Sequence, residues 1–240
     1  MIINGREIAD EILQGLHGPL TLGVVMGADS ASDSFVKMKE RIAQSVGVRM
    51  MRFSPEQMDE ALLCDGVIVQ LPLEGSEALI KRIPPHKDVD ALGEAPLVLP
   101  PVAEAIAEIL TRYDIAVAGK KAVVVGAGAL VGVPALKLLT KAGAHVSVVT
   151  LEQGSLSELR DADIVVLGAG KPRLITPPML KAGVVLFDAG SSELGGKPLG
   201  DADPACANMA SVFTPVPGGI GPIAVAMIFK NLFELAQKHV

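Results

Sequence analysis

Short apolar runs rich in Val, Ile and Leu alternate along the chain with segments that repeat apolar residues at helical spacing. The runs suit buried strands and the repeats suit amphipathic helices, so the pattern predicts an α/β fold with parallel, helix-covered sheets. Strands are expected at 20–26, 48–53, 67–71, 121–125, 145–150, 163–167 and 184–187. Helices are expected at 5–16, 34–46, 55–63, 76–82, 102–113, 134–142, 155–161, 176–181 and from about 222 to 237.

The order of these elements predicts two domains. A loop-rich region from Pro72 to Pro101 follows the first run of strands and helices, and a second run begins after Gly119. The second run is typical of a doubly wound unit, which binds nucleotides at the carboxyl ends of its strands. The apolar helix at the C-terminal end is expected to pack back on the first domain. We therefore expect one domain at 1–113, completed by 222–240, and another at 114–221.

A glycine-rich turn is the clearest motif. The strand at 121–125 is followed by Gly126, Gly128 and Gly132, and a helix is expected to open behind them at Pro134. Glycine allows a tight turn and the close approach of a ligand, and the helix N-terminus offers N–H groups to a phosphate. The third glycine falls one position later than in the common fingerprint. The motif predicts a dinucleotide site, and a plain strand-to-helix turn is the alternative.

Composition and charge narrow the function. Half of the 240 residues are hydrophobic, the formal net charge is −6 and the sequence pI is about 5.3. An acidic chain without a basic run is a poor partner for nucleic acid or for an acidic membrane surface. Neither a signal peptide nor an apolar stretch long and unbroken enough to span a bilayer is apparent, so a soluble, cytoplasmic protein is expected.

Cysteine and histidine do not suggest a metal or redox centre. Cys64 and Cys206 lie far apart and form no CxxC motif, so buried thiols are expected. The four histidines lack ligand spacing, and we expect no metal site.

One lysine is expected to face inward. The predicted helix at 34–46 carries an apolar stripe, and Lys39 falls inside it. A buried ammonium group is costly unless it is paired, so Lys39 either reaches the edge of the core or is held there for a task. A functional lysine would have partners that tune its proton affinity. The stripe consists of Phe35, Met38, Ile42 and Val46.

Polar residues also lie where an α/β sheet binds its ligands. Gln70 ends an apolar strand, and Pro72 stops the sheet behind it. Asp88 and Asp90 lie in a loop bounded by prolines. On their own, the glutamine could simply cap the loop and the aspartates could serve turns. The Pro/Gly-dense segment Thr214–Pro222 cannot be helical, and as a rigid loop it would bring backbone groups beside a ligand.

Together these segments resemble the methylenetetrahydrofolate dehydrogenase/methenyltetrahydrofolate cyclohydrolase family over the whole chain. The last block is nearly the Pro-Gly-Gly-Val-Gly-Pro signature of that family. In chain order the matching blocks are Ser34–Lys39, Asp65–Leu73, Lys87–Asp90, Gly126–Pro134, Gly200–Asp203 and Thr214–Pro222.

The resemblance implies two Rossmann-like domains with parallel sheets and an active-site cleft between them, in a homodimer that acts on tetrahydrofolate derivatives of one-carbon metabolism. It implies hydride transfer from methylenetetrahydrofolate to NADP or NAD, then hydrolysis of the methenyl product to formyltetrahydrofolate. Lys39 would be essential to hydrolysis, Gln70 would tune it and Asp90 would hold the pterin. The implied substrate-binding residues are Phe35, Lys39, Gln70, Leu71, Pro72, Asp90, Pro217, Gly218 and Gly219. The implied cofactor-binding residues are Gly126, Ala127, Gly128, Val131, Gly132, Thr150, Leu151, Glu152, Gly170 and Ser191.

Several positions depart from the family pattern. Phe35 replaces a Tyr and lacks its hydroxyl, which weakens the expectation of cyclohydrolase activity. Ala91 replaces a Gly. Gly126-Ala127-Gly128 replaces Gly-Arg-Ser, and Thr150-Leu151 replaces a His-Ser or similar pair. The nearby Glu152 suits a free ribose 2′-hydroxyl better than a phosphate, so NAD is favoured over NADP.

Three functions stay open on the sequence. The first is the bifunctional dehydrogenase/cyclohydrolase. The second is a monofunctional NAD-linked methylenetetrahydrofolate dehydrogenase, whose reaction stops at the methenyl product. The third is a non-catalytic homologue that binds folate or nucleotide, which the motif changes favour and the retained Lys39, Gln70 and Asp90 oppose.

Overall fold

The computed structural model describes the chain except residues 28–32, 151, 195–196 and 239–240, and for residues 33–35, 193–194 and 197 it describes the backbone alone. The chain divides into two compact units. Unit 1 comprises Met1–Ile8 and Val102–Ala224, and unit 2 comprises Ala9–Pro101 and Val225–Val240. The functional division expected from the sequence, 1–113 with 222–240 against 114–221, stays a prediction.

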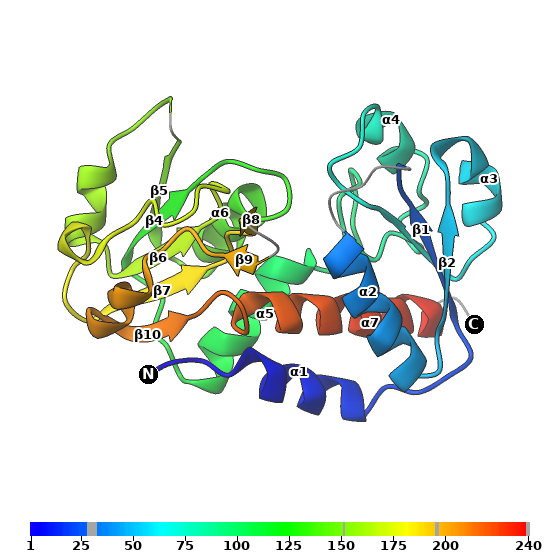
Figure 1. The fold of residues 1–240 in the computed structure, drawn as a ribbon, viewed down its shortest axis with the longest axis horizontal. Coiled ribbons are helices and arrows are strands. Elements are labelled where there is room, and N and C mark those ends of the chain that lie inside the picture. The colour runs from blue at the N-terminus through cyan, green and yellow to red at the C-terminus, as the bar shows by residue number, and fades with distance from the viewer. Residues whose placement is uncertain (28–32, 151, 195–196, 239–240) are drawn as a thin grey trace. The chain divides into compact units, whose positions relative to one another are not determined.

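Unit 1 is built on a five-stranded parallel sheet in the order β10-β7-β6-β4-β5 (Figure 1). In this sheet Val125 lies opposite both Val149 and Leu167, so three strands end at the same level. An open parallel sheet binds its ligands at this edge, where the strands end in loops. The strands are β4 (Lys121–Val125), β5 (His145–Val149), β6 (Ile164–Leu167), β7 (Val184–Asp188) and β10 (Ala210–Thr214).

Helices and short turns connect these strands. The segments expected to be helices at 155–161 and 176–181 are 3₁₀ turns instead. The sequence analysis did not predict the antiparallel pair β8–β9, because strands of three residues are too short to show a period. The elements are α5 (Pro101–Arg112), α6 (Gly132–Lys141), η2 (Leu156–Asp161), η3 (Pro177–Met179), β8 (Ser192–Leu194), β9 (Lys197–Leu199) and η4 (Pro204–Asn208).

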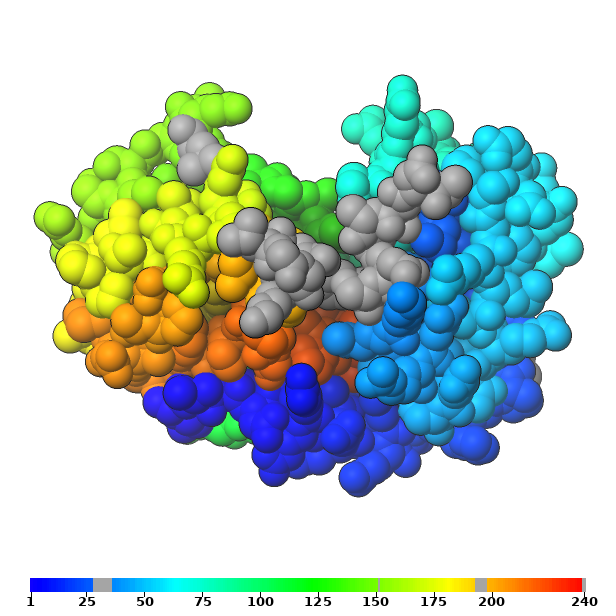
Figure 2. All heavy atoms as spheres, viewed as in Figure 1, coloured from blue at the N-terminus to red at the C-terminus, as the bar shows by residue number. Residues whose placement is uncertain are grey.

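The N-terminal segment covers one edge of the unit 1 sheet. Ile3 donates its backbone N–H to the carbonyl of Phe213, and Phe213 donates to the carbonyl of Met1, both at 2.9 Å. The deep-blue N-terminal residues accordingly lie beside the orange β10 (Figures 1 and 2). These bonds satisfy backbone groups that an edge strand would otherwise expose.

Unit 2 holds a three-stranded parallel sheet in the order β2-β1-β3. Leu22 and Ile68 of this sheet pack in one core cluster with Phe229 and Leu232 of α7. The expectation that the last helix packs on the first domain is confirmed. The elements are α1 (Gly5–Gln14), β1 (Thr21–Val25), α2 (Asp33–Ser45), β2 (Arg49–Phe53), η1 (Pro55–Gln57), α3 (Met58–Ala61), β3 (Gly66–Val69), α4 (Ser76–Ile80) and α7 (Ile220–Gln237), of which α1 and α7 begin in unit 1.

Helix α7 is long and apolar enough to cross a membrane by length and composition, so the expectation that no stretch would qualify is wrong. Apolar helices that lie buried in the core of a protein also meet this criterion. In α7, 67% of the residues are buried inside the protein, and Phe229 and Leu232 are fully covered. Packing against the unit 2 sheet therefore explains the composition of this helix.

Candidate active site

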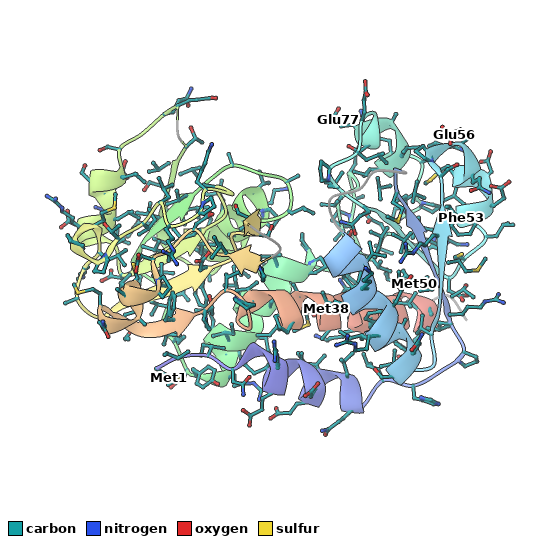
Figure 3. All side chains as sticks on the ribbon, viewed as in Figure 1. Met1, Met38, Met50, Phe53, Glu56 and Glu77 are labelled. Atoms are coloured by element: carbon teal, nitrogen blue, oxygen red, sulfur yellow. The ribbon has the colours of Figure 1, made fainter. Side chains whose placement is uncertain are left out.

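Lys39 lies on the buried face of α2. Its exposure is 6%, and it shares this face with Val36, Ala43 and Val46, each almost fully buried. The expectation of an inward lysine is confirmed, whereas Met38, which was expected on the same stripe, is 37% exposed (Figure 3). Positions 36, 39, 43 and 46 follow helical spacing and form one line along the helix, which leaves Met38 to its side.

Gln70 follows β3 and is the hydrogen-bond partner of Lys39. Its backbone N–H donates to the carbonyl of Val25 at 2.8 Å, which fixes the residue at the end of the sheet. Its Oε1 accepts a 2.7 Å hydrogen bond from Nζ of Lys39, and its Nε2 donates to the carbonyl of Leu71 at 3.1 Å. Because a carbonyl can only accept, Leu71 orients the amide with its oxygen toward the lysine.

Asp90 acts on Lys39 through its charge. Burial lowers the pKa of Lys39, and the carboxylate of Asp90 raises it in part. Burial raises the pKa of Asp90 to about 6, while Lys39 lowers it and the carboxylate of Asp88 raises it. The two groups therefore differ less in proton affinity than they would in water. Such a pair is suited to proton transfer near neutral pH.

The loop that carries Asp90 is held from within. Asp88 is 2% exposed, and its Oδ2 accepts a 2.7 Å hydrogen bond from the backbone N–H of Gly93. Ala91 adopts a left-handed backbone with a φ of 54°, a conformation that L side chains rarely occupy. The turn behind Asp90 is thus fixed but strained.

Asn231 holds the same loop from α7, and the sequence analysis missed it. Its side chain is fully buried, and Nδ2 donates to the carbonyls of Val89 and Leu99, both at 3.0 Å. One amide therefore joins the two ends of the loop that contains Asp90. The available signal was an asparagine in a mostly apolar helix, because such a residue needs a partner when it is buried.

The other expected substrate-binding residues are divided between the units. Leu71 and Pro72 follow Gln70 in unit 2, and the peptide bond between Leu71 and Pro72 is cis. The side chain of Phe35 lies outside the described part of α2. Their contacts with a substrate stay a prediction.

Pro217, Gly218 and Gly219 form a tight turn before α7 in unit 1. Gly219 donates its N–H to the carbonyl of Pro215 at 2.7 Å, and the carbonyl of Gly218 accepts from Gly5 at 2.8 Å. A Cβ atom on Gly219 would lie 2.6 Å from the Pro215 oxygen. Packing within the unit already requires glycine here, and the expected contact with a ligand stays a prediction.

In the glycine turn after β4, close packing requires glycine at two positions, and the remaining glycine, Gly128, faces open space. Gly126 has a φ of 104°, and a Cβ atom there would lie 2.4 Å from the carbonyl oxygen of Gly168. A Cβ atom on Gly132 would lie 2.1 Å from the Gly126 oxygen. A Cβ atom on Gly128 would meet nothing within 4 Å. The first and third glycines close the turn, and the second is the position at which a ligand can approach the backbone.

Helix α6 begins at Gly132, two residues before the expected start at Pro134. Its N-cap residue, Val131, makes no side-chain capping hydrogen bond, and Ala127 beside the turn is exposed. Val133 donates its backbone N–H to the Gly128 carbonyl at 3.1 Å and Pro134 has none, so the N–H groups suited to a phosphate are those of Gly132 and of the turn before it. The residues present therefore fit the pyrophosphate of a dinucleotide.

A second turn follows β5 at the same edge of the sheet. Oγ1 of Thr150 accepts the backbone N–H of Glu152 at 3.3 Å and that of the next residue at 3.0 Å. The side chain of Glu152 is exposed, whereas Leu151 lies outside the described residues. Gly170, after β6, and Ser191, after β7, are also exposed.

The structure thus brings the expected residues together in two groups. Lys39, Gln70 and Asp90 in unit 2 can hold and move a proton, and the glycine turn in unit 1 can hold a dinucleotide. Among the residues that the structure describes, no group of three or more His, Cys, Asp or Glu side chains is arranged to hold a metal ion.

The chain matches known proteins over nearly its whole length. Residues 100–240 match the family described as tetrahydrofolate dehydrogenase/cyclohydrolase, NAD(P)-binding domain. The chain is 35% identical to the bifunctional protein FolD of Halothermothrix orenii, over 99% of this chain and 98% of that protein. It resembles the solved FolD structure from Campylobacter jejuni, with a TM-score of 0.90 and 28% identity over 100% of this chain and 99% of the other. The structure of the Trypanosoma brucei enzyme, solved with NADP and an inhibitor, is also similar, with a TM-score of 0.90. The two chains are 27% identical, and the match covers 99% of this chain and 97% of the other.

Proposed function

Because this chain belongs to the tetrahydrofolate dehydrogenase/cyclohydrolase family, we propose that it oxidises methylenetetrahydrofolate with NAD(P) and hydrolyses the methenyl product to formyltetrahydrofolate. The observation that carries the proposal is the 2.7 Å hydrogen bond between buried Lys39 and Gln70, next to the charge of Asp90. A lysine that transfers protons needs a partner that holds it in place and a neighbouring charge that tunes its proton affinity, and Gln70 and Asp90 supply both.

The oxidation requires alignment more than acid–base help. The folate nitrogen expels hydride from the methylene bridge, and the resulting amidinium cation is stabilised by resonance. NAD(P), when bound, supplies the hydride acceptor. The chain contributes position, with the turn from Gly126 to Gly132 to hold the dinucleotide. We assign the positioning of the substrate to Asp90, Leu71 and Pro72.

The hydrolysis requires proton transfer. Water adds to the methenyl carbon and loses one proton, and the bond from that carbon to one ring nitrogen breaks as that nitrogen gains a proton. The hydroxyl left on the carbon loses its proton to give the formyl group, so one proton is released overall. Lys39, with a pKa lowered by burial, is assigned the transfer of these protons. Gln70 holds the lysine in place through Oε1, and Asp90 balances its charge.

Product analysis tests the proposed function. Purified chain with methylenetetrahydrofolate and NAD or NADP is expected to form reduced cofactor and formyltetrahydrofolate in equal amounts. Accumulation of the methenyl compound would instead indicate the monofunctional dehydrogenase. Binding of both ligands without turnover would indicate the non-catalytic homologue.

We further propose that NAD is preferred over NADP. The Thr150 turn holds the backbone of Glu152 at the end of β5, and a carboxylate there accepts a hydrogen bond from a ribose 2′-hydroxyl but repels a 2′-phosphate. Saturation curves with both cofactors are expected to give the lower KM for NAD, and Glu152→Gln is expected to narrow the difference. A lower KM for NADP at equal kcat would contradict this preference.

The chain is proposed to act as a cytoplasmic homodimer on tetrahydrofolate derivatives. Light scattering behind size-exclusion chromatography is expected to give about twice the 24.8 kDa of one chain. A mass of one chain would contradict the dimer.

A further inference from the structure

Two buried carboxylates that the reaction does not use lie at the ligand-binding edge of the unit 1 sheet. Asp188 ends β7 with 1% exposure, and Asp201 follows β9 with 0% exposure. Each carboxylate accepts three backbone N–H groups. Burial raises the pKa of Asp188 to about 6 and also raises the pKa of Asp201, while the backbone N–H groups lower both. Keeping two acidic groups buried in one unit is costly, so their contacts need an explanation.

Asp201 holds three consecutive residues after β6. Its Oδ2 accepts from the N–H groups of Ala169 at 2.7 Å and Gly170 at 3.1 Å, and its Oδ1 accepts from Lys171 at 2.7 Å. Hydrogen bonds to a charged acceptor are stronger than neutral ones. One side chain therefore sets the path of the loop at 168–171.

Asp188 in turn holds Asp201. Its Oδ1 accepts from the N–H groups of Gly190 at 2.9 Å and Asp201 at 3.1 Å, and its Oδ2 accepts from Ala202 at 2.8 Å. A Cβ atom on Gly200 would lie 2.1 Å from Oδ2 of Asp188. The backbone therefore approaches this carboxylate so closely that only glycine fits at position 200.

The loop held by Asp201 packs directly on the glycine turn. A Cβ atom on Gly126 would lie 2.4 Å from the carbonyl oxygen of Gly168 and 3.0 Å from the nitrogen of Ala169. A Cβ atom on Gly168 would lie 2.4 Å from Val131, the N-cap residue of α6. Movement of the loop at 168–171 would therefore displace the turn and the helix start.

We propose that Asp201, held by Asp188, is a positioning residue for NAD(P), because it keeps the loop at 168–171 against the Gly126 turn. The inference rests on the proposed function only in that this turn binds NAD(P). Neither carboxylate needs to touch the cofactor, and neither takes part in the chemistry.

The variant Asp201→Asn tests this role, with Asp203→Asn as the matched control. The amide that this substitution introduces at position 201 replaces one acceptor oxygen with a donor that faces N–H groups. Asp203 lies two residues away, and among the side-chain hydrogen bonds of the described residues its Oδ1 accepts only from Ala205, so it does not hold the loop. We expect Asp201→Asn to raise the Kd of NAD(P) in calorimetry at least about 10-fold, the effect of losing a charged hydrogen bond. Asp203→Asn is expected to bind as wild type does.

A second readout separates positioning from folding. Hydrolysis of methenyltetrahydrofolate consumes no NAD(P), so its rate in Asp201→Asn is expected to stay within about two-fold of wild type while the KM for NAD(P) rises. Equal loss of both activities, or an unchanged Kd, would overturn the proposal. Calorimetry needs no turnover, so a wild type that binds NAD(P) without catalysis would refute the proposed function and leave this test intact.

Asp188→Asn provides the test if Asp201→Asn does not fold. This variant reaches the loop only through Asp201, so a smaller rise in Kd, about three-fold, is expected, together with faster hydrogen exchange at Ala169, Gly170 and Lys171. Unchanged exchange and unchanged Kd in a folded Asp188→Asn would overturn the proposal.

Discussion

Nζ of Lys39 and Oε1 of Gln70 lie 2.7 Å apart, although the two residues are separated by 31 positions in the chain. Helix α2 brings the lysine to the core, and the end of β3 brings the amide to the lysine. The Leu71 carbonyl leaves the amide one orientation, with its oxygen toward the ammonium group. The fold itself therefore sets the geometry of the pair.

Removal of the amide is expected to destabilise the protein and slow hydrolysis. In Gln70→Leu the buried ammonium group loses its acceptor, which costs about 1–3 kcal/mol. Urea unfolding measures the loss, and Gln44→Leu is the control, because Gln44 is exposed on the same helix as Lys39 and its side chain makes no hydrogen bond among the described residues. Equal unfolding free energies for the two variants would show that the Lys39–Gln70 bond contributes nothing.

Asp90 is expected to make stability depend on pH. Its pKa is raised to about 6 in the folded protein, so between pH 4 and 6 the folded state binds more protons than the unfolded state and stability falls as pH rises. Asp90→Asn lacks this effect and should gain stability relative to wild type across that range, by at most about 3 kcal/mol. Urea unfolding at several pH values measures the difference. A difference that is constant with pH would contradict the raised pKa.

Ala91→Gly is expected to stabilise the loop behind Asp90. Ala91 has a φ of 54°, and glycine adopts this conformation without the steric penalty. The penalty of about 1–2 kcal/mol is partly offset by the greater freedom of glycine in the unfolded chain, so a net gain of about 0.5–1 kcal/mol is expected in urea unfolding. Ala95→Gly, at an exposed position in the same loop without a positive φ, should give no gain. Loss of stability in Ala91→Gly would refute the strain.

Asn231→Ala is expected to loosen the loop that carries Asp90. The carbonyls of Val89 and Leu99 each lose a hydrogen bond from Nδ2, which costs about 1–3 kcal/mol of stability. The KM for methylenetetrahydrofolate should rise while the Kd of NAD(P) stays unchanged, because the contacts of Asn231 lie in unit 2. A rise in the Kd of NAD(P) instead would show that the asparagine has a different role.

The sequence was sufficient for the strands β1 to β7 and for the inward face of one helix, but it did not predict β8, β9 or β10. All seven expected strands are present, because each is a short apolar run with a turn after it. Lys39 could be placed because the helical period is local. Met38 was misplaced, since a stripe drawn from sequence fixes the buried face only to within about one residue.

Long-range hydrogen bonds could not be predicted in the same way. The contacts of Asn231 with Val89 and Leu99 span more than a hundred residues, and those of Asp201 are made with backbone N–H groups that every residue except proline supplies. Neither leaves a pattern in the sequence beyond a polar residue in an apolar setting. The structure was needed to show what each side chain holds.

The most direct test of the bifunctional assignment follows the hydrolysis of methenyltetrahydrofolate by its absorbance, without NAD(P), in wild type, Lys39→Ala and Lys37→Ala. Lys37 is an exposed lysine on the same helix and serves as the control. Wild type and Lys37→Ala are expected to hydrolyse the substrate at similar rates, and Lys39→Ala at least about 100-fold more slowly, the usual contribution of a general acid–base group. A Lys39→Ala rate equal to that of wild type, or a wild-type rate equal to spontaneous hydrolysis, would contradict the assignment.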